Sequence, residues 1–113
     1  MRYLLAAALL LAPGIASAHA VLVQSTPEPE ASVVAGPTEL VLRFNSRIDQ
    51  ARSRLTLRGS NAEMTLPLEP GRTVDTLAAK AVLTPGHYVV HWQVLAVDGH
   101  MTRGDVGFTV QPR

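Results

Sequence analysis

Cysteine is absent from this chain of 113 residues. The absence excludes disulfide bridges, thiolate zinc sites, iron–sulfur clusters and cysteine nucleophiles. Charge is also scarce, because charged residues make up 17% of the chain and the formal net charge is +1. A nucleic-acid-binding domain would be far more basic. The length fits one domain, and the hydrophobic share of 47% is typical of a folded chain.

The short motifs of common enzymes are missing as well. The sequence contains no GxSxG, HExxH, GxxxxGK[ST] or GxGxxG pattern. Nothing therefore indicates a serine hydrolase, a zinc protease or a nucleotide-binding site.

The first 18 residues have the features of a signal peptide. Arg2 precedes an apolar run at residues 4–12, and Ala16-Ser17-Ala18 is a small-x-small cleavage signal. The run is too short to cross a bilayer, which needs about 20 residues, so it would act as an anchor only if cleavage failed. We predict cleavage after Ala18, a mature domain at residues 19–113, export to the periplasm and no membrane insertion afterwards. Loss of Arg2 leaves nine basic and nine acidic residues, a balance that does not favour binding to DNA or membranes.

Alternating hydrophobic residues predict an all-β fold. Residues 40–44 and 52–58 alternate, and the longest run, His87–Val97, places its even-numbered residues from Tyr88 to Ala96 on one face. Residues 107–110 predict a last short strand, whereas residues 73–82 fit either a strand or a short helix. Turn residues, among them Gly36-Pro37, separate runs spaced by roughly ten residues, and this spacing is typical of a Greek-key β-sandwich.

The Asp98-Gly99-His100 triplet and the predicted mature N-terminus at His19 carry donor groups for a metal. Residues two apart in a strand share a face, so Asp98 and His100 project together if strand geometry continues through Gly99. Cleavage after Ala18 gives His19 a free α-amine beside its imidazole, and both can bind one ion. Two imidazoles, an amine and a carboxylate suit tetragonal Cu(II). We predict a one-ion Cu(II) site at His19, Asp98 and His100, although Asp-Gly is also an ordinary turn signal.

The remaining histidines and methionines do not add to this site. His87 and His91 lie on the face opposite Trp92 and are expected to face solvent. Met64 and Met101 are isolated, whereas Cu(I) prefers clustered thioethers. We therefore expect no Cu(I) site.

Residues 43–58 are locally basic, with Asp49 as the one acidic residue among five arginines. Such a stretch is either a solvated strand face or a docking patch for an acidic partner. The arginines are Arg43, Arg47, Arg52, Arg54 and Arg58.

Taken together, these residues resemble the CopC-type copper resistance proteins of the bacterial periplasm, over nearly the whole of residues 19–113. The matching motifs are His19-Ala20-x-Leu22-x-x-Ser25-x-Pro27, Pro37-x-x-Leu40-x-Leu42-x-Phe44, Pro85-Gly86-x-Tyr88-x-Val90-x-Trp92-x-Val94 and Asp98-Gly99-His100-x-x-x-Gly104-x-x-x-Phe108-x-Val110.

The resemblance implies an immunoglobulin-like Greek-key sandwich or barrel that binds Cu(II) through His19, Asp98 and His100. It implies a carrier or buffer in copper tolerance or uptake rather than an enzyme, working beside a separate inner-membrane partner of the CopD type. Some family members carry a methionine-rich Cu(I) loop, but residues 48–64 contain only Met64. Asn45-Ser46-Arg47 also replaces the family's usual Ser-Glu-Pro.

Two other functions fit parts of the sequence. A mature histidine with a second histidine resembles the oxidative copper enzymes of the histidine-brace type, although a carboxylate ligand opposes reduction of the copper. A metal-free adhesion or assembly sandwich would use the Asp98-Gly99-His100 triplet only as a turn.

Overall fold

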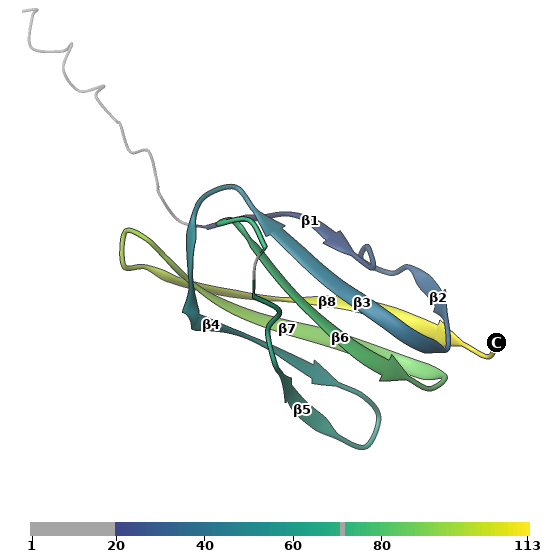
Figure 1. The fold of residues 1–113 in the computed structure, drawn as a ribbon. Helices are drawn as coiled ribbons and strands as arrows, with labels where there is room; N and C mark the ends of the chain where they lie inside the picture. Colours follow the sequence, from purple (N-terminus) through teal and green to yellow (C-terminus); the bar gives the residue numbers. More distant parts are fainter. Residues whose placement is uncertain (1–19, 71) are drawn as a thin grey trace, which may run out of the picture.

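The computed structural model describes residues 20–70 and 72–113, which form two β-sheets and no helix. The three-stranded sheet has the order β1-β3-β6, and the five-stranded sheet has the order β2-β8-β7-β4-β5. Figure 1 shows the two sheets as the layers of a sandwich, so the predicted all-β sandwich is confirmed. The strands are β1 (Leu22–Thr26), β2 (Ser32–Val34), β3 (Gly36–Phe44), β4 (Ile48–Arg58), β5 (Glu63–Leu66), β6 (Thr76–Leu83), β7 (Gly86–Ala96) and β8 (Met101–Gln111).

The core is built from the alternating residues that the sequence singles out. Leu40, Leu42 and Phe44 of β3 are buried against the other sheet, and Leu55 and Leu57 of β4 face them. In β7 the buried residues are the even-numbered ones from Val90 to Ala96. The prediction that one face of each strand fills the core is therefore confirmed for all three strands.

Element boundaries differ from the predicted ones where the hydrophobic pattern is weak. Gly36-Pro37 begins β3 instead of forming a turn, because proline is tolerated at the start of a strand. Residues 76–83 are a strand, β6, and its first four residues are all buried, so the period of two is lost there. The last strand, β8, starts at Met101 rather than at Gly107. The hydrophobic pattern missed its first half, because that half carries polar residues and a glycine.

Within the described ranges 20–70 and 72–113, no helix is long and apolar enough to cross a membrane.

Trp92 fixes the packing between β7 and β8. Its ring meets Phe44 edge-on, with ring centroids 5.1 Å apart. Gly104 lies directly opposite Trp92 on β8, and a Cβ atom at this position would lie 2.5 Å from Trp92 Cζ2. The indole therefore occupies the space that a side chain would need, and only glycine fits beside it.

We predict that Gly104→Ala lowers the free energy of unfolding by about 1–3 kcal/mol, because overpacking shifts the ring or the backbone. Thermal or urea unfolding measures the change. Gly107→Ala is the matched control on the same strand, since its Cβ would lie at ordinary contact distances, 3.6 Å from the His87 ring and 3.9 Å from Glu30 Oε2. Equal stability of the two variants would contradict the packing account.

The carboxylate of Asp75 stabilises the turn before β6 through two hydrogen bonds. Asp75 Oδ1 accepts hydrogen bonds from the hydroxyls of Thr73, at 2.7 Å, and Thr76, at 2.9 Å. These two bonds, with a smaller contribution from the charge of Arg43, hold the pKa of Asp75 below its ordinary value of 3.8. Phe44 N–H also donates to the Asp75 carbonyl, so this turn ties β3 to the start of β6.

A lowered pKa in the folded state means that the ionised carboxylate stabilises the fold above the unfolded-state pKa of about 4. This contribution is lost as the pH falls through the folded-state pKa. We therefore expect the stability of Asp75→Asn to fall less steeply than that of the wild type below about pH 4. The free energy of unfolding of both proteins is measured with urea at a series of pH values. If the two values fall in parallel as the pH is lowered, Asp75 does not contribute to the pH dependence.

Candidate metal centre

The Asp98-Gly99-His100 triplet forms the turn of the β7–β8 hairpin. Ala96 N–H donates to the His100 carbonyl at 2.8 Å, and Gly99 N–H donates to the Ala96 carbonyl at 2.9 Å. Gly99 has a φ of +94°, in the left-handed region that glycine favours. The expectation that strand geometry continues through Gly99 is therefore wrong, because the chain reverses direction there.

The two side chains nevertheless meet, for a different physical reason. Asp98 Oδ1 accepts the backbone N–H of His100 at 3.0 Å, which is the local bond of an Asx turn. The other oxygen, Oδ2, lies 2.9 Å from His100 Nδ1. The carboxylate thus holds both the backbone and the ring of His100. When Nδ1 carries the proton of this contact, Nε2 holds the lone pair that can bind a metal.

The described start of the chain is fixed beside this turn. The Ala20 carbonyl accepts a hydrogen bond from Thr102 Oγ1 at 2.9 Å, and Ala20 is 1% exposed. Val21 N–H donates to Asn45 Oδ1 at 2.8 Å, while Asn45 N–H donates to the Val21 carbonyl at 2.9 Å. Thr102 comes two residues after His100. Figure 1 shows the start of the coloured chain and the β7–β8 turn at the same end of the sandwich.

His19 and the proposed cleavage site after Ala18 lie outside the described residues. Among residues 20–70 and 72–113, no group of three or more His, Asp or Glu side chains could hold a metal ion. The structure therefore brings together two of the three predicted ligands, Asp98 and His100. A site with three protein ligands needs a donor from another part of the chain.

The other two described histidines, His87 and His91, differ in their exposure. His87 is exposed, as predicted. His91 was expected to face solvent, but its side chain is only 23% exposed, and its Nδ1 lies 2.7 Å from Asp105 Oδ1. The pairing arises because His91 and Asp105 are directly opposite in the β7–β8 register. Met64 and Met101 lie on the surface, 53% and 41% exposed.

The basic stretch at residues 43–58 does not form one patch. Arg52 forms an ion pair with Asp49 at 2.8 Å, and Arg58 forms one with Glu63 at 2.6 Å. Arg43 lies on the other sheet, where its guanidinium bonds Gln24 Oε1 at 3.3 Å. The arginines of this stretch therefore serve different surfaces.

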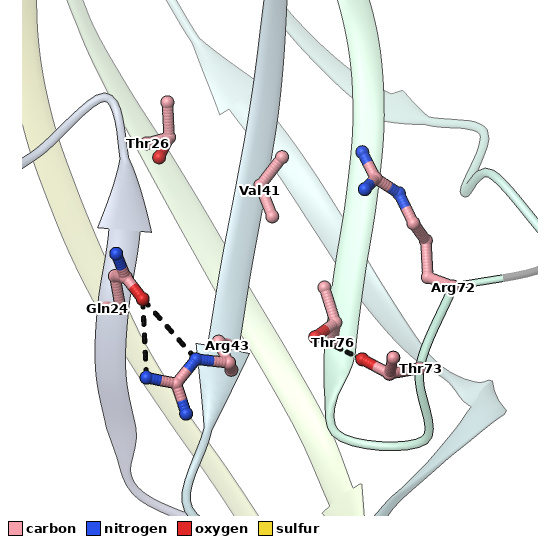
Figure 2. Close-up of a pocket in the computed structure, with 7 residues that line it drawn as sticks. All are labelled: Gln24, Thr26, Val41, Arg43, Arg72, Thr73 and Thr76. Carbon is pink, nitrogen blue, oxygen red and sulfur yellow. Dashed lines mark hydrogen bonds between the residues drawn. The ribbon is translucent and has the colours of Figure 1, made fainter.

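A shallow hollow of about 400 Å³ lies on the outer face of the three-stranded sheet, and Figure 2 shows its lining residues. No histidine or carboxylate lines it, and it does not include the β7–β8 turn, so it is not a candidate metal site. Its lining residues are Gln24, Thr26, Val41, Arg43, Arg72, Thr73 and Thr76.

The chain matches the family model described as the CopC domain over residues 22–111. It is 31% identical to copper resistance protein C of Pseudomonas syringae pv. tomato over 122 residues, covering 93% of this chain and 90% of that protein. It is 32% identical to protein YobA of Escherichia coli K12 over 99 residues, covering 83% and 80% of the two chains.

Solved structures show the same relationship. The crystal structure of CopC from Methylosinus trichosporium OB3b is similar with a TM-score of 0.73 and 30% identity, over 84% of this chain and 96% of that one. The structure of PcoC from E. coli, described as a methionine-rich copper resistance protein, gives a TM-score of 0.68 and 28% identity, over 83% and 100% of the two chains.

CopC family proteins are copper-binding resistance proteins and not enzymes, which agrees with the prediction of a non-enzymatic function. The resemblance predicted from the sequence motifs is confirmed by the family model, the relatives and the solved structures. The chain belongs to the CopC family of copper resistance proteins.

Proposed function

We propose that this protein is a periplasmic Cu(II) carrier or buffer, which holds one cupric ion between the processed terminus at His19 and the pair Asp98 and His100. The observation that supports this most strongly is the hydrogen bond from Thr102 to the Ala20 carbonyl, because it fixes the residue after His19 next to the turn that carries the pair.

The reach of the chain supports the third ligand. Consecutive Cα atoms are about 3.8 Å apart, so His19 is one peptide unit from the buried Ala20. Thr102 is two residues from His100, or about 7 Å along a strand. The donor groups of His19 therefore need to span only a short distance to reach the ion that His100 binds.

The donors select the oxidation state of the copper. An amine, two imidazoles and a carboxylate are borderline to hard ligands, which suit Cu(II) in tetragonal geometry. The thioethers that Cu(I) prefers are not gathered here, because Met64 lies on β5 and Met101 at the start of β8. We propose one Cu(II) ion and no Cu(I) site.

Processing is part of the proposal. The α-amine of His19 becomes a ligand only when residues 1–18 are removed, since in the unprocessed chain this nitrogen is the amide of the peptide bond to Ala18. Cleavage after Ala18 would release the domain at residues 19–113 in the periplasm. We propose that an inner-membrane protein of the CopD type then receives the copper.

His100→Ala is expected to lower the Cu(II) affinity of the processed protein by at least about 100-fold. Loss of a residue that merely supports a metal ligand costs 10–100-fold, and His100 is proposed to bind the ion directly. A competition titration against a chelator measures the affinity. His87→Ala is the matched control, since His87 is an exposed histidine at the other end of β7. Unchanged affinity in His100→Ala would refute the assignment.

Thr102→Val tests the position of the terminus without removing a ligand. The variant keeps the shape of the side chain but loses the hydroxyl that donates to Ala20, so the His19 donors are held less well. We expect Cu(II) affinity to fall by about 10-fold while the circular dichroism spectrum is retained. Thr102→Ser keeps the hydroxyl and should keep the affinity. Equal affinities in the two variants would argue that the terminus is not positioned in this way.

A further inference from the structure

Two arginines lie on either side of β7 on the outer surface of the five-stranded sheet. Arg54 of β4 is directly opposite Gln93 of β7, and Gln93 is directly opposite Arg103 of β8. Directly opposed residues point to the same face of a sheet, and here that face is the outer one, because Leu55 and Trp92 point inward. Neighbouring strands are about 4.8 Å apart, so the two arginine backbones lie roughly 10 Å apart.

These two guanidinium groups differ from those of Arg52 and Arg58 on the same sheet, because neither has a carboxylate partner among residues 20–70 and 72–113. Within the described parts of the chain, neither Arg54 nor Arg103 forms an ion pair. The neighbouring carboxylates each contact another side chain, and both arginines are exposed. Asp49 pairs with Arg52, Glu63 with Arg58 and Asp105 with His91.

This pair lies next to the turn that carries the proposed metal ligands. Arg103 follows His100 by three residues, or about 10 Å of strand. The row of residues between the arginine pair and the turn is apolar, because Leu95 is directly opposite Met101. Met101 is 41% exposed, and Val97, in the turn itself, is 63% exposed. The surface beside the turn thus combines exposed apolar side chains with two positive charges that form no ion pair within the described part of the chain.

We infer that Arg54, Gln93 and Arg103, with Met101 and Val97, form a docking surface for an acidic segment of a partner protein, which is thereby brought to the copper-bearing turn. The inference rests on the proposed function, because it names the chemistry of the copper recipient. Carboxylates of the partner would pair with the two guanidinium groups, and Gln93 would offer a further hydrogen bond between them. An apolar side chain of the partner would cover Met101 and Val97.

The residue types favour a protein carboxylate over an anionic membrane. Arginine presents a planar fork that matches a carboxylate with two parallel hydrogen bonds. A membrane surface instead attracts broad clusters of positive charge, and residues 19–113 carry nine basic and nine acidic side chains, with Lys80 as their one lysine. Two arginines at a fixed spacing are a specific feature of this face rather than an effect of net charge.

The test uses copper-free processed protein and a capped hexaglutamate peptide at low ionic strength, followed by NMR. The protein is kept free of copper because the peptide itself binds Cu(II). We expect chemical shifts to change around Arg54, Gln93 and Arg103 and the changes to vanish at high salt. Arg54→Gln/Arg103→Gln should weaken peptide binding at least 10-fold. Hexaglutamine should not bind.

Arg43→Gln/Arg113→Gln is the matched control, because it removes the same charge from two arginines that form no ion pair among the described residues and lie elsewhere. It should change peptide binding less than twofold. Equal weakening in both double variants, or no peptide binding to the wild type, would overturn the inference. Binding only to phosphatidylglycerol vesicles would also overturn it in favour of a membrane surface.

A Cu(II) competition titration separates this inference from the proposed function. Arg54→Gln/Arg103→Gln should keep the Cu(II) affinity of the wild type, since neither arginine is a proposed ligand. Normal copper binding without peptide binding would refute the docking surface alone. Loss of copper binding in the wild type itself would refute the proposed function.

Discussion

The hydrogen bond between Thr102 Oγ1 and the Ala20 carbonyl joins two parts of the chain that are 82 residues apart in sequence. The proposed copper site depends on it, because Asp98 and His100 would supply two of its ligands and no group of three or more His, Asp or Glu side chains among the described residues could hold a metal ion. The bond in turn depends on the register of β7 and β8, which sets where Thr102 lies. Trp92 and Gly104 lock that register, since the indole fits only against a glycine. Core packing and the proposed copper site are therefore linked through one hairpin.

Much of the fold could be predicted from the sequence, because the core strands alternate. Leu40, Leu55 and Trp92 each belong to a run whose buried face is visible in the residue pattern. The pairing of Asp98 with His100 was predicted for the wrong reason, since it comes from an Asx turn at Gly99 and not from a continuing strand. Turn chemistry at an Asp-Gly step could have given the correct geometry. The contact between Ala20 and Thr102 could not be predicted, because it requires the register of the whole sandwich.

The spatial grouping of the arginines could not be predicted from the sequence either. Nearness in sequence grouped Arg43 with Arg54, yet the two lie on different sheets, and the residue that accompanies Arg54 in space is Arg103. Cross-strand neighbours are set by register, which sequence proximity does not reveal. Once the register is known, a surface for a carboxylate-bearing partner emerges beside the proposed copper site. Binding and delivery of the metal would then use adjacent parts of the β7–β8 hairpin together with the neighbouring strand β4.

The proposed copper site is complete only when processing frees the terminus at His19. The most direct test compares the electron paramagnetic resonance spectra of two forms of the protein, each with one equivalent of Cu(II) and with its N-terminus established by mass spectrometry. The chain that begins at His19 should give a tetragonal spectrum with three nitrogen ligands, and the chain that retains residues 1–18 should give a different spectrum and weaker binding. Identical spectra and affinities, or an exported protein that begins at another residue, would contradict the account.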